Sequence, residues 1–155
     1  MKTLFPARTT FGGPKWVLYV WWVITIVTLG RSIAHIVLPD GGAMSIASIP
    51  LDHYSLAAQE TIVAMFALWG LSQLLVGLVY VLVLVRQQSW IPFISLLLVI
   101  EYAIRIGLGF FKTVVTVNTA PGVAGNLPLL LIGIVLLIVS LNTSDRPSSD
   151  ESLSV

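Results

Sequence analysis

Four apolar runs, each about as long as a lipid bilayer is thick, occupy most of this chain of 155 residues. A transmembrane helix needs roughly 20 consecutive apolar residues to cross a hydrocarbon core about 30 Å thick. The sequence therefore predicts an all-α fold, an integral membrane four-helix bundle, with loops at 39–57 and 114–126. The four expected spans are about 16–38, 58–85, 90–113 and 127–141.

Two polar segments flank the expected bundle. Residues 1–15 form a basic N-terminal segment, and residues 142–155 form a Ser-rich tail whose composition is typical of disorder. Charged residues make up 10% of the chain, compared with about 25% in soluble domains. Lipid is therefore the expected solvent for most of the chain, and little sequence remains for a soluble catalytic domain.

Net charge and cysteine content exclude several kinds of site. The formal net charge of +1 gives no strong basic field, so we expect no nucleic-acid partner. The chain has no cysteine. Disulfides, thiolate metal sites, iron–sulfur clusters and thiol nucleophiles are therefore excluded.

The distribution of lysine and arginine predicts the orientation of the bundle. Lys2, Arg8 and Lys15 precede the first span, and Arg86 lies in the turn between the second and third spans. The loop at 39–57 contains no lysine or arginine. Because basic loops stay on the cytoplasmic side, we expect cytoplasmic N- and C-termini in a multi-pass protein of a cytoplasmic (inner) membrane.

The first run also has some features of a signal peptide. Lys15 precedes an apolar run, and small residues follow at Ser32 and Ala34. Arg31, just before the supposed cleavage site, is atypical, and the run continues to Leu38. We therefore expect this run to be retained as a span.

Ionisable residues lie inside three of the expected spans. Arg31 and His35 lie in the first, Glu60 in the first turn of the second, and Glu101 and Arg105 in the third. Their positions place Arg31, His35 and Glu60 in the outer half of the bundle, Glu101 near the midplane, and Arg105 about 6 Å further out than Glu101. Charged side chains in a span cost roughly 2.5–3.5 kcal/mol each and usually face the bundle interior. We therefore predict one outward-opening polar pocket that uses these residues to bind a ligand.

Structural explanations compete with this pocket. Glu101 and Arg105 are spaced i, i+4, so they can pair within one helix and serve only to neutralise charge. His35 alone is more typical of a hydrogen-bonded interior histidine than of a ligand-binding one. A metal site would need His35 and His53 beside acidic groups, and their spacing matches no metal motif. We therefore predict no metal, no haem, no other cofactor and no catalytic residue.

Several segments resemble the small four-helix bacterial membrane proteins described as DoxX-like. The resemblance covers about residues 16–141 and rests on "LGRSIAHIVLPDGG", "AAQETIVAMFALWGLSQLLVGLVYVLV", "IEYAIRIGLGF" and "TAPG". It implies four helices in a bacterial-type cytoplasmic membrane. It implies no uniform activity, because some members associate with respiratory oxidases and many have no known role, and no catalytic residue is carried over.

Three functions are compatible with this sequence. The first is a non-enzymatic membrane protein whose pocket binds a lipid or small amphiphile, with arginines at the head group and apolar walls around the tail. The second is an accessory subunit of a larger membrane complex, of which a respiratory complex is one candidate, with Phe66 and Trp69 as the contact surface. The third is a proton-coupled carrier or membrane enzyme that uses Glu101. A homo-oligomer is also possible, since Gly70 and Gly77 could serve either dimerisation or internal packing.

Overall fold

Every regular element in residues 7–144, the part of the chain described by the computed structural model, is helical. The long helices are α1 (Lys15–Val37), α2 (Leu56–Arg86), α3 (Ile91–Phe111) and α4 (Pro121–Ser144), and the short 3-10 helices are η1 (Leu51–His53) and η2 (Gln88–Trp90). All four long helices are long and apolar enough to cross a membrane, with mean hydropathies between 1.6 and 2.5. The predicted all-α class with four such helices is confirmed.

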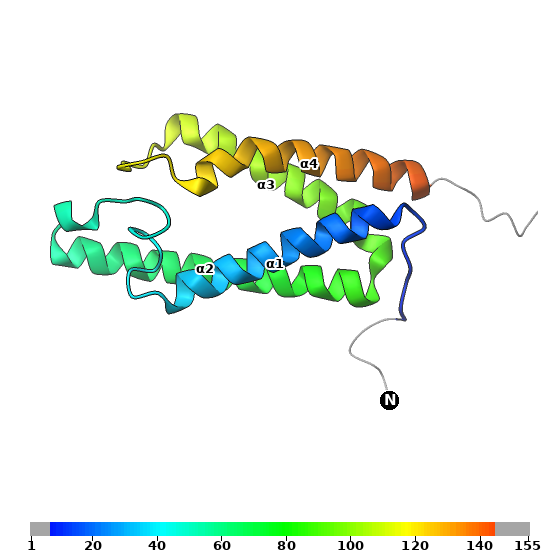
Figure 1. Cartoon of the computed structure of the whole chain (residues 1–155), viewed down its shortest axis with the longest axis horizontal. Helices are drawn as coiled ribbons and strands as arrows, with labels where there is room; N and C mark the ends of the chain where they lie inside the picture. The colour runs from blue at the N-terminus through cyan, green and yellow to red at the C-terminus, as the bar shows by residue number, and fades with distance from the viewer. Residues whose placement is uncertain (1–6, 145–155) are drawn as a thin grey trace, which may run out of the picture.

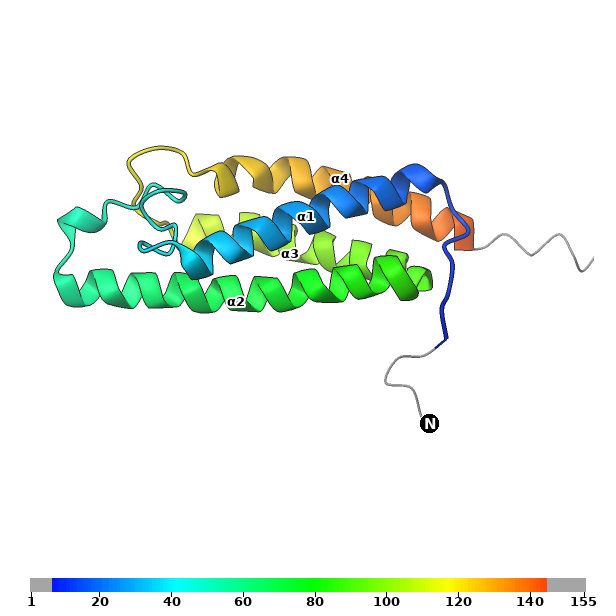
Figure 2. The same cartoon turned by 60° about the horizontal axis from the view of Figure 1, so that its bottom comes forward.

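The four helices form two side-by-side pairs (Figures 1 and 2). α1 packs along α2, and α3 packs along α4, whereas α2 and α3 touch at few positions. We call the end that contains η2 the turn end, and the end that contains loops 38–55 and 112–120 the loop end. The described parts of both chain termini lie at the turn end.

Side chains, rather than close backbone contact, join the two pairs near the turn end. Trp21 of α1 is completely buried and packs edge-on against Tyr80 of α2, with ring centroids 5.0 Å apart. Its indole Nε1 donates a hydrogen bond of 3.3 Å to the hydroxyl of Ser95 on α3. Ile91 and Leu136 are also completely buried in this cluster, so all four helices contribute to one core.

The N-terminal segment closes the turn end. The backbone N–H of Thr9 donates to the carbonyl of Arg86 at 2.9 Å, and that of Gln88 donates back to Thr9 at 3.3 Å. The side-chain Oε1 of Gln88 accepts from the backbone of Phe11 at 3.1 Å. Residues before α1 are therefore bonded to the turn between α2 and α3.

Two glycines of α2 allow α1 to approach closely. A Cβ at Gly70 would lie 2.8 Å from the Cβ of His35, and a Cβ at Gly77 would lie 2.6 Å from a methyl group of Leu29. Side chains are therefore excluded at both positions by α1 itself. Of the two roles that the sequence left open, internal packing is the one these glycines perform here.

The start of α4 differs from the expectation. We predicted a loop over 114–126, but α4 begins at Pro121. Proline suits the first turn of a helix, where no N–H partner is needed. The carbonyl of Ala120 accepts hydrogen bonds from Val123 and Ala124, which starts the helix before the apolar run. At its other end α4 includes residues 142–144, and the rest of the tail expected to be disordered lies outside the described residues.

Candidate functional site

The loop after α1 folds back onto the end of that helix. Gly41 and Gly42 both have positive φ angles, 59° and 75°, which favour glycine. The carbonyl of Gly41 is 2.7 Å from Nδ1 of His35. A Cβ at Gly42 would lie 2.8 Å from the same nitrogen, so a side chain there would displace the histidine. The glycine pair therefore fixes the position of His35.

Asp40 holds this loop in shape. Its carboxylate accepts backbone hydrogen bonds from Gly42 at 2.9 Å, Met44 at 3.1 Å and Ser45 at 2.7 Å. Partial burial acts to raise the pKa of Asp40, but the hydrogen bonds from Ser45, Gly42 and Met44 lower it below its ordinary value. The charged form of Asp40 is thus the form that the folded loop favours.

A small apolar cluster fastens the loop to α2. Ala43, Ile49 and Leu51 are buried there against side chains of α2 that include Phe66. The carbonyl of Ser48 also accepts a hydrogen bond of 2.9 Å from the backbone of Val117. This bond joins the α1–α2 loop to the α3–α4 loop across the loop end.

A cavity of about 460 Å³ lies beneath these two loops. We call it the loop-end pocket. Its size falls in the range of small-molecule sites, about 300–1,000 Å³. Its lining is mostly apolar and includes three basic side chains from two helices, Arg31 and His35 of α1 and Arg105 of α3. The structure thus places these three predicted site residues around one pocket.

Both arginines of the pocket lie against the same tryptophan. The guanidinium carbon of Arg31 is 5.2 Å from the ring centroid of Trp69, and that of Arg105 is 5.4 Å from it. Cations over an aromatic face are attracted by the electron density of the ring. Trp69 therefore brings two like charges together in a mostly apolar wall.

Glu101 lies beside the pocket as the partner of Arg105. Its Oε1 accepts hydrogen bonds from Nη2 of Arg105 at 2.6 Å and from Nε at 3.0 Å. The i, i+4 pair expected from the sequence therefore forms. Arg31 forms no ion pair with Glu101, and in the described part of the chain it has no carboxylate partner at all.

His35 has a structural role as well as a place in the pocket wall. It is 2% exposed, its Nδ1 is bonded to a backbone carbonyl, and its ring packs against Phe66 and Trp69. Because the carbonyl can only accept, Nδ1 carries the proton in this hydrogen bond. The second ring nitrogen is therefore the atom of His35 that remains for other interactions.

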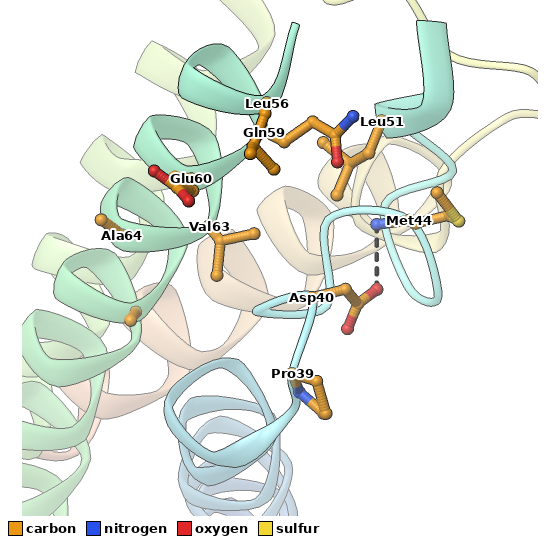
Figure 3. A pocket seen from close by; sticks show the side chains of 10 residues that line it. Pro39, Asp40, Met44, Leu51, Leu56, Gln59, Glu60, Val63 and Ala64 are labelled. Atoms are coloured by element: carbon orange, nitrogen blue, oxygen red, sulfur yellow. Dashed lines mark hydrogen bonds between the residues drawn. The ribbon is translucent and has the colours of Figure 1, made fainter. Parts of the chain in front are cut away.

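Glu60 lies apart from the other predicted site residues. It lines a separate depression of about 560 Å³, which we call the Glu60 depression. Figure 3 shows Glu60 and Ala64 on α2, with Asp40 across the depression. Glu60 precedes Trp69 by about two and a half helical turns, so the two side chains leave opposite faces of α2. Glu60 therefore does not join the shared pocket that the sequence predicted.

Phe66 and Trp69 differ most from the expectation. We considered them as an exposed contact surface, but both are half-buried and line the loop-end pocket. The reason is His35, which packs against both rings and so draws this face of α2 toward α1. Sequence reasoning also missed the pocket residues supplied by the loops, such as Ile49 and Val114. Long-range loop packing has no periodic signal that could have revealed them.

Neither a metal site nor a relationship to a known protein narrows the function of this site further. No group of three or more histidine and acidic side chains suited to a metal ion occurs within residues 7–144. No protein-family model matches the chain, and neither curated proteins nor solved structures gave a match. The resemblance to DoxX-like proteins therefore stays a prediction.

Proposed function

We propose that this chain is a small multi-pass membrane protein that binds a lipid or small amphiphile in the loop-end pocket. The supporting observation is the pocket itself, an apolar cavity of about 460 Å³ with Arg31, His35 and Arg105 in its wall. An amphiphile has the same division of chemistry, since its head group is polar and its tail is apolar. The surroundings of the pocket therefore suit both parts of one molecule.

The exterior of the helices supports insertion in a membrane. Side chains such as Val23, Ile26, Leu75 and Ile104 are 55–64% exposed along the helices, and water would disfavour so continuous an apolar exterior. Lipid is a suitable solvent for it. The hydropathies of all four helices are in the range expected of spans.

Basic residues favour a cytoplasmic turn end. Arg8, Lys15 and Arg86 lie there, whereas the loop at 39–57 has no lysine or arginine and the loop at 112–120 has only Lys112. On this basis both termini would be cytoplasmic, in a bacterial-type cytoplasmic membrane, and the loop-end pocket would lie near the outer surface.

Native mass spectrometry with a pocket-filling variant tests this function. Ala47 lines the pocket, so Ala47→Trp should exclude a bound amphiphile. Ala124→Trp is the control, because this exposed residue of α4 does not line the pocket. We expect the wild type and the control to retain a small amphiphile after gentle extraction, and Ala47→Trp to lose it.

Two other outcomes would contradict the proposal. Retention of the same amphiphile by Ala47→Trp would place it outside the pocket. A protein partner retained without any small molecule would favour the accessory-subunit function instead.

A further inference from the structure

The two arginines of the loop-end pocket differ in how their charges are balanced. Arg105 is paired with the carboxylate of Glu101 at 2.6 Å. Arg31 forms no ion pair within residues 7–144, and its Nε is buried without a hydrogen-bond partner. The guanidinium groups of Arg31 and Arg105 and the carboxylate of Glu101 together carry one positive charge. The charge that remains unpaired is that of Arg31.

The surroundings of Arg31 stabilise its charge without neutralising it. Its guanidinium lies over Trp69, 5.2 Å from the ring centroid, and interacts with the phenol of Tyr102. Neither ring carries a formal negative charge. Contact with an aromatic face also leaves the in-plane N–H groups of a guanidinium available, and these match the two oxygens of a carboxylate or phosphate.

The apolar part of the pocket reaches the outside of the bundle between α2 and the start of α4. Met65, Val114 and Val123 line the pocket and are nevertheless 64%, 66% and 63% exposed. Leu68, one turn from Met65 on α2, is also 64% exposed. The cavity therefore opens onto apolar helix surface, which is where a tail could continue into lipid.

We infer that the ligand of this pocket is a monoanionic amphiphile whose head group binds Arg31 and whose tail leaves between α2 and α4, past Met65 and Val123. This inference rests on the proposed function and adds to it the charge of the ligand and its direction. The shared chemistry is one acidic head group on an apolar tail. A free fatty acid and an anionic phospholipid both provide it.

Matched pairs of amphiphiles test the inference on the full chain after removal of bound lipid. Oleate and monoolein carry the same chain but differ in charge, and phosphatidylglycerol and phosphatidylcholine differ likewise. Loss of one charge-assisted contact weakens binding by roughly 10- to 100-fold. We expect oleate or phosphatidylglycerol to bind the wild type at least about 10-fold more tightly than its uncharged or zwitterionic counterpart.

Charge variants identify the residue responsible. Arg31→Gln should remove the preference for the anion, and Arg31→Lys should retain most of it. Lys112→Gln makes the same change of charge at an exposed residue that does not line the pocket, so it should leave the preference unchanged. Glu101→Gln frees the charge of Arg105 and should tighten anion binding, which provides a second readout if Arg31→Gln folds poorly.

The outcomes separate this inference from the proposed function. Equal binding of charged and uncharged amphiphiles, with both blocked by Ala47→Trp, would overturn the inference and leave the pocket function standing. Binding that Ala47→Trp does not affect would overturn both. Preference for oleate over phosphatidylglycerol would support a free acid as the source of the head group, and the reverse would support a phospholipid.

Discussion

Two tryptophans at the two ends of the bundle show how differently one apolar sequence can be used. Trp21, toward the turn end, is completely buried, packs on Tyr80 and donates a hydrogen bond to Ser95. Trp69, toward the loop end, is half-buried, lines a cavity and faces two guanidinium groups. The first joins helices in a closed core, whereas the second packs on His35 of α1 and also borders a cavity.

Under the proposed function, stability and binding are divided between the two ends of the molecule. The helix pairs meet through the large buried cluster around Trp21, whereas at the loop end the smaller cluster of Ala43, Ile49 and Leu51 packs beside a cavity. Packing without voids stabilises a bundle, but it leaves no room for a ligand. A cavity can be maintained at one end because the other end is densely packed.

Substitution of the two tryptophans should give the largest difference in unfolding free energy between the two ends of the bundle. Trp21→Ala removes a fully buried ring of α1 that contacts both α2 and α3, and such changes cost about 3–5 kcal/mol. Trp69→Ala enlarges an existing cavity, so its cost in unfolding free energy should be clearly smaller, while binding in the pocket should be lost. Unfolding in detergent, followed by circular dichroism, measures the first effect, and ligand binding measures the second. Equal losses of stability would contradict the division proposed here.

A glycine substitution should give an intermediate effect near the pocket. Gly70→Val places a side chain where even a Cβ atom would lie only 2.8 Å from the Cβ of His35 and 3.0 Å from the carbonyl oxygen of Ser32. Overpacking of this kind costs about 1–3 kcal/mol. Gly30→Val is the matched control, because a Cβ at Gly30 meets nothing within 4 Å. The temperature of thermal unfolding should fall only for Gly70→Val. An equal fall for Gly30→Val would point to helix propensity instead of packing.

The sequence predicts most of the architecture because its strongest signals are local. Each long apolar run needs only its own composition to specify a helix, and the Asp40–Gly41–Gly42 turn follows from residue types that adopt it readily. The pair of Glu101 and Arg105 was predictable for the same reason, since it depends on one turn of one helix.

The site was predictable only in part because it depends on distant contacts. Position along the helices placed Arg31, His35 and Arg105 at similar depths, but it could not show that Trp69 lies beside both arginines. Glu60 lies at a suitable depth but on the wrong face of α2. Depth follows from position along a helix, whereas the facing of a side chain depends on which neighbour the helix packs against.

Acidification should give the smallest and most local effect, confined to the loop end. The folded loop lowers the pKa of Asp40, so its charged form contributes stability above the ordinary pKa of the carboxyl, and this contribution is lost as pH falls through the lowered value. Below about pH 4 we therefore expect faster opening of the backbone amides of Gly42, Met44 and Ser45, by roughly threefold or more. Hydrogen exchange measures this opening of the amides. The rates are expressed as protection factors, which correct for the intrinsic effect of pH on exchange.

Two aspartate variants sharpen this last test. Asp40→Asn should lose protection at these amides already at pH 7 and show little further change on acidification. Asp52→Asn alters another acidic residue of the same loop, one whose side chain is 71% exposed, and should keep the response of the wild type. Amides around Trp21 should stay protected throughout, because the hydrogen bonds of that core, from Trp21 to the Ser95 hydroxyl and from Thr25 to the carbonyl of Trp21, involve no carboxylate. Loss of protection at both ends together would show that the loop end and the turn end unfold as one unit.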